Sequence, residues 1–336
     1  MKNRILTYLL CSVSLLSLLS CGEDTSLSGG TPSVGDDRVS VEFTFSDTAT
    51  RAGETLDDAL VRSVDALVFR RSTGVIEAAA RVSSPTATLT IPRNTELDCY
   101  FFTNLDASVL SSVTSVGQLA SLRASLADNE SALLMEGHVS RSFTLPTTVH
   151  VSLVRLCSKV TVKMATVDFY HDALSVTLRR AYLINAIGDS SLLPSSGEPL
   201  ASSWIHKGTY DLSLLSPLTY RELDIPVTSS ESILLDLSLY TYPNPTDNGH
   251  THDSHPLWDE RNSRLVLEVE VNGVTYYYPV TLPSMSSGVE YLVSNALLLG
   301  LGRTHPDTVA EPRMMVGMAV AVEPWTDEPD KEIELQ

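Results

Sequence analysis

Apolar and polar residues alternate along much of this chain, which is the pattern of a β-strand with one buried face. In the clearest early stretch, polar residues separate four apolar residues that share one face: Val39, Val41, Phe43 and Phe45. Further stretches of this kind predict strands at 64–69, 87–91, 97–103, 149–156 and 160–164. A chain built from many short strands folds into packed β-sheets.

The second half of the chain repeats the pattern at 233–239, 265–271 and 274–282. Asn272-Gly273 separates the last two stretches, and such a pair favours a tight hairpin turn whose central residues need positive φ. In the first half, one helix is predicted where apolar residues recur at helical spacing: Val116, Leu119, Leu122 and Leu126. We therefore predict an all-β protein with two antiparallel β-sandwich domains, residues 38–157 and 158–336, and one short helix in the first.

Residues 1–20 have the properties of a secretory signal peptide. Lys2 and Arg4 precede an apolar stretch at 5–19 that is too short to serve as a lasting transmembrane helix. The stretch ends in Leu18-Leu19-Ser20-Cys21, which resembles a lipobox, so we expect Cys21 to carry the lipid. An ordinary signal peptide followed by an incidental cysteine is the alternative. With a polar tether over 21–37, this pattern predicts a surface lipoprotein of the cell outer membrane.

The chain is strongly acidic. It has 23 Lys and Arg residues against 41 Asp and Glu residues, which gives a formal charge of −18. Such a surface repels nucleic acid and anionic lipid headgroups, so neither is a predicted partner. With 336 residues, of which 43% are hydrophobic, the chain has enough apolar surface for two cores.

The last alternating stretch, at 314–322, is apolar on both faces. The large side chains share one face, and the opposite face is mostly small: the large ones are Met314, Val316, Met318, Val320 and Val322. A strand with two apolar faces must be covered on both sides or enter a groove. Pro324-Trp325 then ends the strand.

The sequence carries no catalytic constellation. It has no Gly-x-Ser-x-Gly elbow, phosphate-binding glycine loop or paired-cysteine motif, so we predict neither an enzyme nor a cofactor. Zinc is one interpretation of the loop with His250, His252 and His255, but we prefer a solvated loop without metal. Cys99 and Cys157 either form a disulfide or are two separately buried thiols, and the lack of a spacing motif favours the thiols.

Taken in order, these features resemble the Bacteroidales fimbrillins, the subunits of type V pili, over nearly the whole mature chain. The matching features are the lipobox at Cys21, the strand at 39–45, Thr50-Arg51-Ala52, 64–69 with Ser72-Thr73-Gly74, 100–104, Leu134-Met135-Glu136-Gly137, the linking strand from Arg155 to Lys159, 240–244, Tyr276-Tyr277-Tyr278, Gly302 with His305-Pro306-Asp307, and Val322-Glu323-Pro324-Trp325. A long insertion at 244–259 departs from the family's pattern.

The resemblance implies two transthyretin-like β-sandwich domains and assembly by strand exchange. In the family, an Arg-specific protease cuts after the first strand, which leaves with its lipid tether and opens an apolar groove. In this sequence the cut falls between Arg51 and Ala52, and the donor for the groove is 314–322 of a neighbouring subunit. From the residues alone, a plain loop arginine and an intramolecular strand are the preferred interpretations; the resemblance favours the functional ones.

The leading hypothesis is a structural subunit that polymerises with other fimbrial subunits. The second is an anchor or tip adhesin of the same pilus, which binds a host or bacterial surface ligand. The third is a glycan-binding surface lipoprotein that does not polymerise. Its only aromatic candidates are Tyr240, Tyr242 and Trp258 near the insertion.

Overall fold

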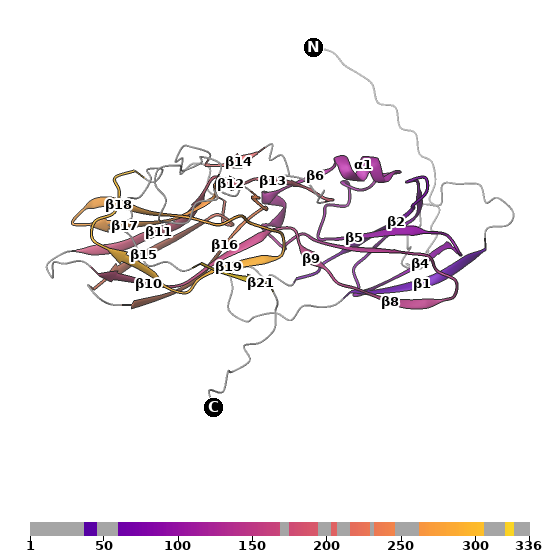
Figure 1. The fold of residues 1–336 in the computed structure, drawn as a ribbon, viewed down its shortest axis with the longest axis horizontal. Helices are drawn as coiled ribbons and strands as arrows, with labels where there is room; N and C mark the ends of the chain where they lie inside the picture. The colour runs from indigo at the N-terminus through magenta and orange to yellow at the C-terminus, as the bar shows by residue number, and fades with distance from the viewer. Residues whose placement is uncertain are drawn as a thin grey trace, which may run out of the picture. The chain divides into compact units, whose positions relative to one another are not determined.

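The computed structural model describes residues 37–45, 60–168, 175–193, 203–206, 216–228, 232–245, 262–305 and 320–325. These residues form β-sheets with one short α-helix and one short 3-10 helix among them (Figure 1). The predicted all-β class is confirmed.

The first half of the chain builds two facing sheets. The three-stranded sheet has the order β4-β1-β8 and contains β1 (Arg38–Phe45), β4 (Thr86–Pro92) and β8 (Thr147–Val151). The five-stranded sheet has the order β3-β2-β5-β7-β9 and contains β2 (Val64–Arg70), β3 (Ile76–Val82), β5 (Leu97–Thr103), β7 (Met135–Arg141) and β9 (Val154–Arg155). Apolar side chains from both sheets meet in one buried cluster, the first core.

The second half repeats this arrangement. One sheet has the order β15-β11-β17-β18 and contains β11 (Val176–Ile184), β15 (Tyr220–Val227), β17 (Arg264–Val271) and β18 (Val274–Thr281). The other has the order β16-β10-β19-β21, with β20 also paired to β10, and contains β10 (Ser158–Asp168), β16 (Ser232–Thr241), β19 (Val289–Val293), β20 (Ala296–Leu299) and β21 (Val320–Pro324). Their apolar faces form the second core.

A third core draws on both halves of the chain. Its surroundings include the short elements α1 (Val116–Ser121), β6 (Arg123–Ser125), the 3-10 helix η1 (Leu126–Asn129), β12 (Ala186–Ile187), β13 (Asp189–Ser191) and β14 (Trp204–Ile205). β6 pairs with β13, and β12 pairs with β14. The described residues all lie in one compact unit, so the predicted domain boundary at residue 157 stays a prediction.

Most strand pairs are antiparallel, but each half contains parallel ones. β1 runs parallel to β8, and β10 runs parallel to both β19 and β20. A parallel partner cannot be reached by a tight hairpin, so these pairs join parts of the chain that lie far apart in sequence.

The Asn272-Gly273 hairpin is confirmed. The two residues separate β17 from β18, and both have positive φ, 50° at Asn272 and 82° at Gly273. The twist of such a turn matches the twist of the two strands, and the register continues without a break from Val271↔Val274 to Arg264↔Thr281.

The predicted helix is too long. α1 ends at Ser121, and Leu122 already has an extended backbone with ψ of 144°. The next three residues pair with β13, where Arg123 forms an ion pair with Asp189. Leu126 is still buried, but at the start of η1, because a turn, a strand and a 3-10 helix bury these residues as well as a helix would.

The single strand predicted at 149–156 is also wrong. The chain leaves the three-stranded sheet after Val151 and joins the five-stranded sheet at Val154. β8 pairs with β1, whereas β9 pairs with β7. One stretch therefore crosses between two layers, which an apolar pattern does not reveal because apolar residues occur on both sides of the crossing.

Two glycines with positive φ, Gly273 and Gly288, can be used to test how backbone conformation and close packing each oppose a side chain in a turn. Gly273→Ala places a Cβ in open space, so only the backbone conformation opposes it, and we expect a loss of about 1 kcal/mol in the free energy of unfolding. Gly288 also has a positive φ, 63°, and in Gly288→Ala the added Cβ would lie 2.7 Å from Cγ1 of Val154. We expect it to cost about 2 kcal/mol or more. Equal urea midpoints for the two variants would contradict this account.

Candidate functional site

β1 lies in the middle of its sheet. It pairs antiparallel with β4 from Arg38↔Pro92 to Thr44↔Thr86. On its other edge it pairs in parallel with β8, from Val41↔Thr147 to Phe45↔Val151. In Figure 1, β1 therefore lies between β4 and β8. Removing it would leave two strands with unpaired inner edges and a gap between them.

One face of β1 is completely buried. Exposed fractions are 2% for Val39, 0% for Val41, 0% for Phe43 and 7% for Phe45. The ring of Phe43 lies 4.9 Å from that of Phe101 and 6.1 Å from that of Phe143, while Phe45 lies 5.3 Å from Phe101. The predicted strand with one buried face is confirmed, and its displacement stays a prediction.

β21 is the second candidate element, and it carries the last residues of the predicted donor stretch. Among the described strands it pairs only with β19, from Val289↔Pro324 to Val293↔Val320. Val320 is half-buried against the second core, and Val322 is 58% exposed. Met314, Val316 and Met318 lie outside the described residues.

Several predicted site residues fall outside the part of the chain that the structure describes. They are the lipidation residue Cys21, the cleavage pair Arg51 and Ala52, the loop histidines His250, His252 and His255, and Trp258. Within the described ranges, no group of three or more His, Cys, Asp and Glu side chains is arranged to hold a metal ion. No helix in these ranges is long and apolar enough to cross a membrane.

Two of the three aromatic candidates for a sugar platform, Tyr240 and Tyr242, are buried. Tyr240 is 1% exposed and Tyr242 is 0% exposed, so neither can stack against a sugar ring. The hydroxyl of Tyr242 donates to the carbonyl oxygen of Ser125 and accepts a hydrogen bond from Asn129 Nδ2. These two candidates are excluded because both residues face the third core, which the apolar pattern of the second half did not indicate.

Cys99 and Cys157 are both fully buried and form no disulfide with each other, so the two separate thiols are confirmed. They belong to different clusters, the first core and the third core. Burial raises the pKa of the Cys99 thiol to about 12, and the nearby Asp98 carboxylate adds to this. At neutral pH Cys99 is therefore protonated and unreactive.

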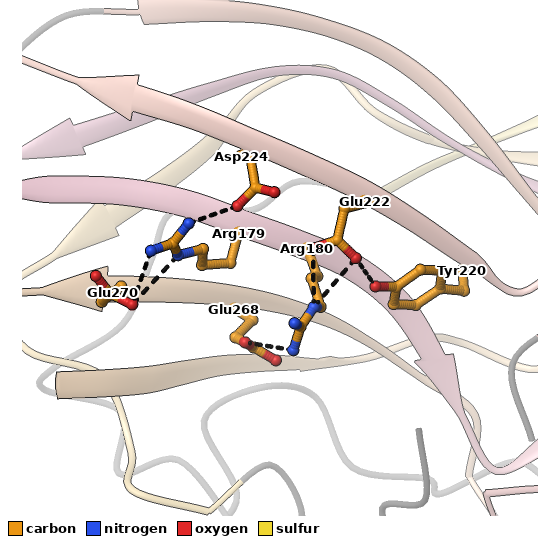
Figure 2. Close-up of polar contacts among 7 residues, drawn as sticks. All are labelled: Arg179, Arg180, Tyr220, Glu222, Asp224, Glu268 and Glu270. Carbon is orange, nitrogen blue, oxygen red and sulfur yellow. Dashed lines mark hydrogen bonds and ion pairs between the residues drawn. The ribbon is translucent and has the colours of Figure 1, made fainter. Parts of the chain in front are cut away.

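A network of charges covers the outer face of β11 and its neighbours (Figure 2). A register shift between Leu178 and Arg180 turns two consecutive arginines to the same face. Arg179 bonds Asp224 at 2.6 Å and Glu270 at 2.9 Å. Arg180 bonds Glu222 at 3.3 Å and Glu268 at 3.0 Å. Each arginine thus ties β11 to the strands on both sides.

The same network holds a tyrosine. Tyr220 donates a hydrogen bond to Glu222, beside Arg180, as Figure 2 shows. Burial, and next the hydrogen bond to Glu222, raise the pKa of Tyr220 to about 12. The phenol is therefore neutral at physiological pH, and the arrangement connects three neighbouring strands of one sheet.

No family model and no curated protein sequence matches the chain. A solved structure provisionally named a cell adhesion protein, from Bacteroides eggerthii DSM 20697, has a TM-score of 0.64 and 17% identity, covering 88% of this chain and 98% of that one. A fimbrilin from Porphyromonas gingivalis W83 has a TM-score of 0.61 and 15% identity, with 86% and 98% covered.

A third similar structure is the tip fimbrial protein Mfa3 from Porphyromonas gingivalis, with a TM-score of 0.54 and 15% identity. The match covers 86% of this chain and 100% of that one. At such identities the likeness establishes a shared fold. The chain therefore has the fold of these fimbrial proteins, and the predicted resemblance to fimbrillins is confirmed at the level of fold.

The packing of Phe43 in the first core predicts how much a smaller side chain there would destabilise the protein. Phe43→Ala should lower the free energy of unfolding by about 3–5 kcal/mol, because it leaves a cavity beside Phe101 and Phe143. Ser40→Ala, on the exposed face of the same strand, should change it by less than about 0.5 kcal/mol. Urea denaturation of the two variants measures the difference. A small effect of Phe43→Ala would show that β1 is not a necessary part of the core.

Glu136 gives a pH-dependent prediction. Burial raises the pKa of its carboxyl group above the ordinary glutamate value, so the folded state keeps the proton to higher pH than the unfolded state. The protonated carboxyl group of Glu136 therefore favours the folded state. This contribution to the free energy of unfolding is lost as pH rises from the ordinary glutamate pKa through the raised pKa of Glu136. We expect Glu136→Gln to raise the urea midpoint at pH 7, with a gain that shrinks below the ordinary glutamate pKa. Glu96→Gln, with a side chain 59% exposed, is the control.

Proposed function

We propose that this protein is a fimbrillin-type structural subunit of a bacterial surface fimbria. The observation that carries the proposal is the position of β1, whose four buried side chains fill the first core while β4 and β8 bond both its edges. The shared fold with the Porphyromonas gingivalis fimbrilin and tip fimbrial protein supports it. A subunit of this kind acts through its surfaces and edges and performs no catalysis.

In this proposal the chain is exported as a lipoprotein. The signal peptide is removed, Cys21 is lipidated, and the tether over 21–37 joins the lipid to β1. Because several acyl chains bind a bilayer firmly, the precursor is held at the outer membrane. The first strand of the sheet is thus also the part of the protein closest to the anchor.

An Arg-specific protease then cuts between Arg51 and Ala52. This bond lies after β1 and before β2, so the cut separates β1 covalently from every other described strand. Noncovalent contacts alone then hold β1 in place, chiefly its two ladders and its four apolar side chains. When β1 leaves, the gap between β4 and β8 exposes the apolar residues of the first core.

A donor stretch from another subunit fills the gap. Residues 314–322 offer large apolar side chains at every second position, as β1 does. Burial of a large apolar side chain contributes about 1.5–3 kcal/mol, and the strand ladders add register. The partners are other fimbrial subunits. The alternative of an anchor or tip adhesin uses the same groove and is supported by the fold of the tip protein.

Cleavage of the purified precursor tests the proposal. We expect wild-type precursor treated with an Arg-specific protease to form a ladder of polymers on a gel, and Arg51→Ala to stay monomeric while remaining folded. Arg38→Ala is the matched control. Arg38 is the first residue of β1, so a cut there leaves the four buried side chains with the domain, and this variant should polymerise normally.

The outcomes separate the roles. Normal polymerisation of Arg51→Ala would contradict the cleavage step. Polymers in the wild type support a shaft subunit, whereas addition of one partner and no more supports a terminal position in the fimbria.

A further inference from the structure

The strand β21 buries little apolar surface, so apolar contacts by themselves hold it only weakly in its sheet. Val322 lies opposite Tyr291, which is 1% exposed, yet Val322 itself is 58% exposed. Val320 is only half-buried, and within the described residues β21 bonds a single strand. A short edge strand with this little burial separates easily from its sheet unless something else fixes it.

The residue that follows β21 is held much more firmly. Trp325 is 7% exposed, and its backbone N–H donates to the carbonyl oxygen of Gly288 at 3.1 Å. Its indole ring lies 4.5 Å from the guanidinium carbon of Arg155 and 5.4 Å from the ammonium nitrogen of Lys159. The ring of Tyr240 lies 5.9 Å away. We call these three side chains the Trp325 cage.

The cage holds Trp325 through cation–π contacts to its ring and through a long hydrogen bond to its backbone. Arg155 is 4% exposed and Lys159 is 5% exposed, so both cations meet the indole ring away from water. Cation–π contacts are strongest with tryptophan and gain strength when water is excluded. Arg155 Nη1 also donates to the carbonyl oxygen of Trp325 at 3.5 Å. The backbone and the ring of Trp325 are therefore both fixed.

The cage lies where the two halves of the chain join. Arg155 belongs to β9, the last strand of the first half, and Lys159 belongs to β10, the first strand of the second half. Gly288, which receives the N–H of Trp325, touches the same place, since a Cβ there would meet Val154. The end of the chain's last described strand is thus attached to the segment that links the halves.

We propose that the Trp325 cage is a retaining device that keeps the C-terminal edge strand β21 on its own subunit. Trp325 must leave the cage before β21 can separate from β19. In combination with the proposed function, on which this second part rests, withdrawal of Trp325 is the step that frees the tail to enter a neighbouring subunit. The cage thereby limits release of the tail and suppresses its premature insertion elsewhere.

Hydrogen exchange of the full mature, uncleaved chain tests the retaining role without any assembly. In the wild type, the amides of β21 that bond β19 should exchange slowly. We expect exchange in β21 to be about tenfold faster, or more, in Trp325→Ala. Trp325→Phe should be intermediate, because phenylalanine binds cations more weakly than tryptophan. Leu234→Ala, an exposed apolar residue of β16 in the same sheet, is the control and should leave the rate unchanged.

Hydrogen exchange of the β17 amides shows whether each variant is still folded. This strand lies in the opposite sheet, so its protection should be the same in all variants, and Trp325→Phe replaces Trp325→Ala if the latter loses it. Unchanged exchange in β21 for a folded Trp325 variant would overturn the proposal. Assembly is measured separately on protease-treated protein. Faster exchange with no faster polymerisation would leave the retaining role standing and count against the tail as the donor.

Discussion

The burial of β1 is the interaction on which the first half of the structure depends. Its four apolar side chains fill the space between two sheets, and it supplies the hydrogen-bonding edge for both β4 and β8. A strand in this position cannot be lost without leaving apolar surface and unpaired backbone groups behind. In the proposed assembly, a domain that loses this strand has to bind another strand in its place, and this requirement is what would drive polymerisation by exchange.

Local patterns predicted the elements that depend on neighbouring residues. The alternation at 39–45 and the Asn272-Gly273 turn were both predicted, because strand faces and turn conformations are set by residues a few positions apart. The parallel pairing of β1 with β8 was not predicted, since no local pattern specifies a partner a hundred positions away. The helix at 116–126 was too long because its apolar spacing suits a turn and a 3-10 helix equally.

The Trp325 cage shows the same limit at the candidate site. Arg155, Lys159 and Trp325 all stood in stretches that resemble the fimbrillin pattern, but the sequence gives no reason to place them together. Arg155 and Trp325 are separated by 170 positions. Tyr240 and Tyr242 were candidates for a sugar platform in one alternative hypothesis, and the sequence did not reveal that a third core formed from both halves encloses them.

The parallel ladder between β1 and β8 also fixes an order of events in synthesis. Thr44 bonds His150, 106 positions further along the chain, so the ladder cannot form until that residue has left the ribosome. Contacts between such distant positions form slowly, because a long loop must close before they contribute. The edge of β1 that faces β8 therefore stays unpaired until β8 has been synthesised, and during this interval the apolar side chains of β1 are open to contacts with other proteins.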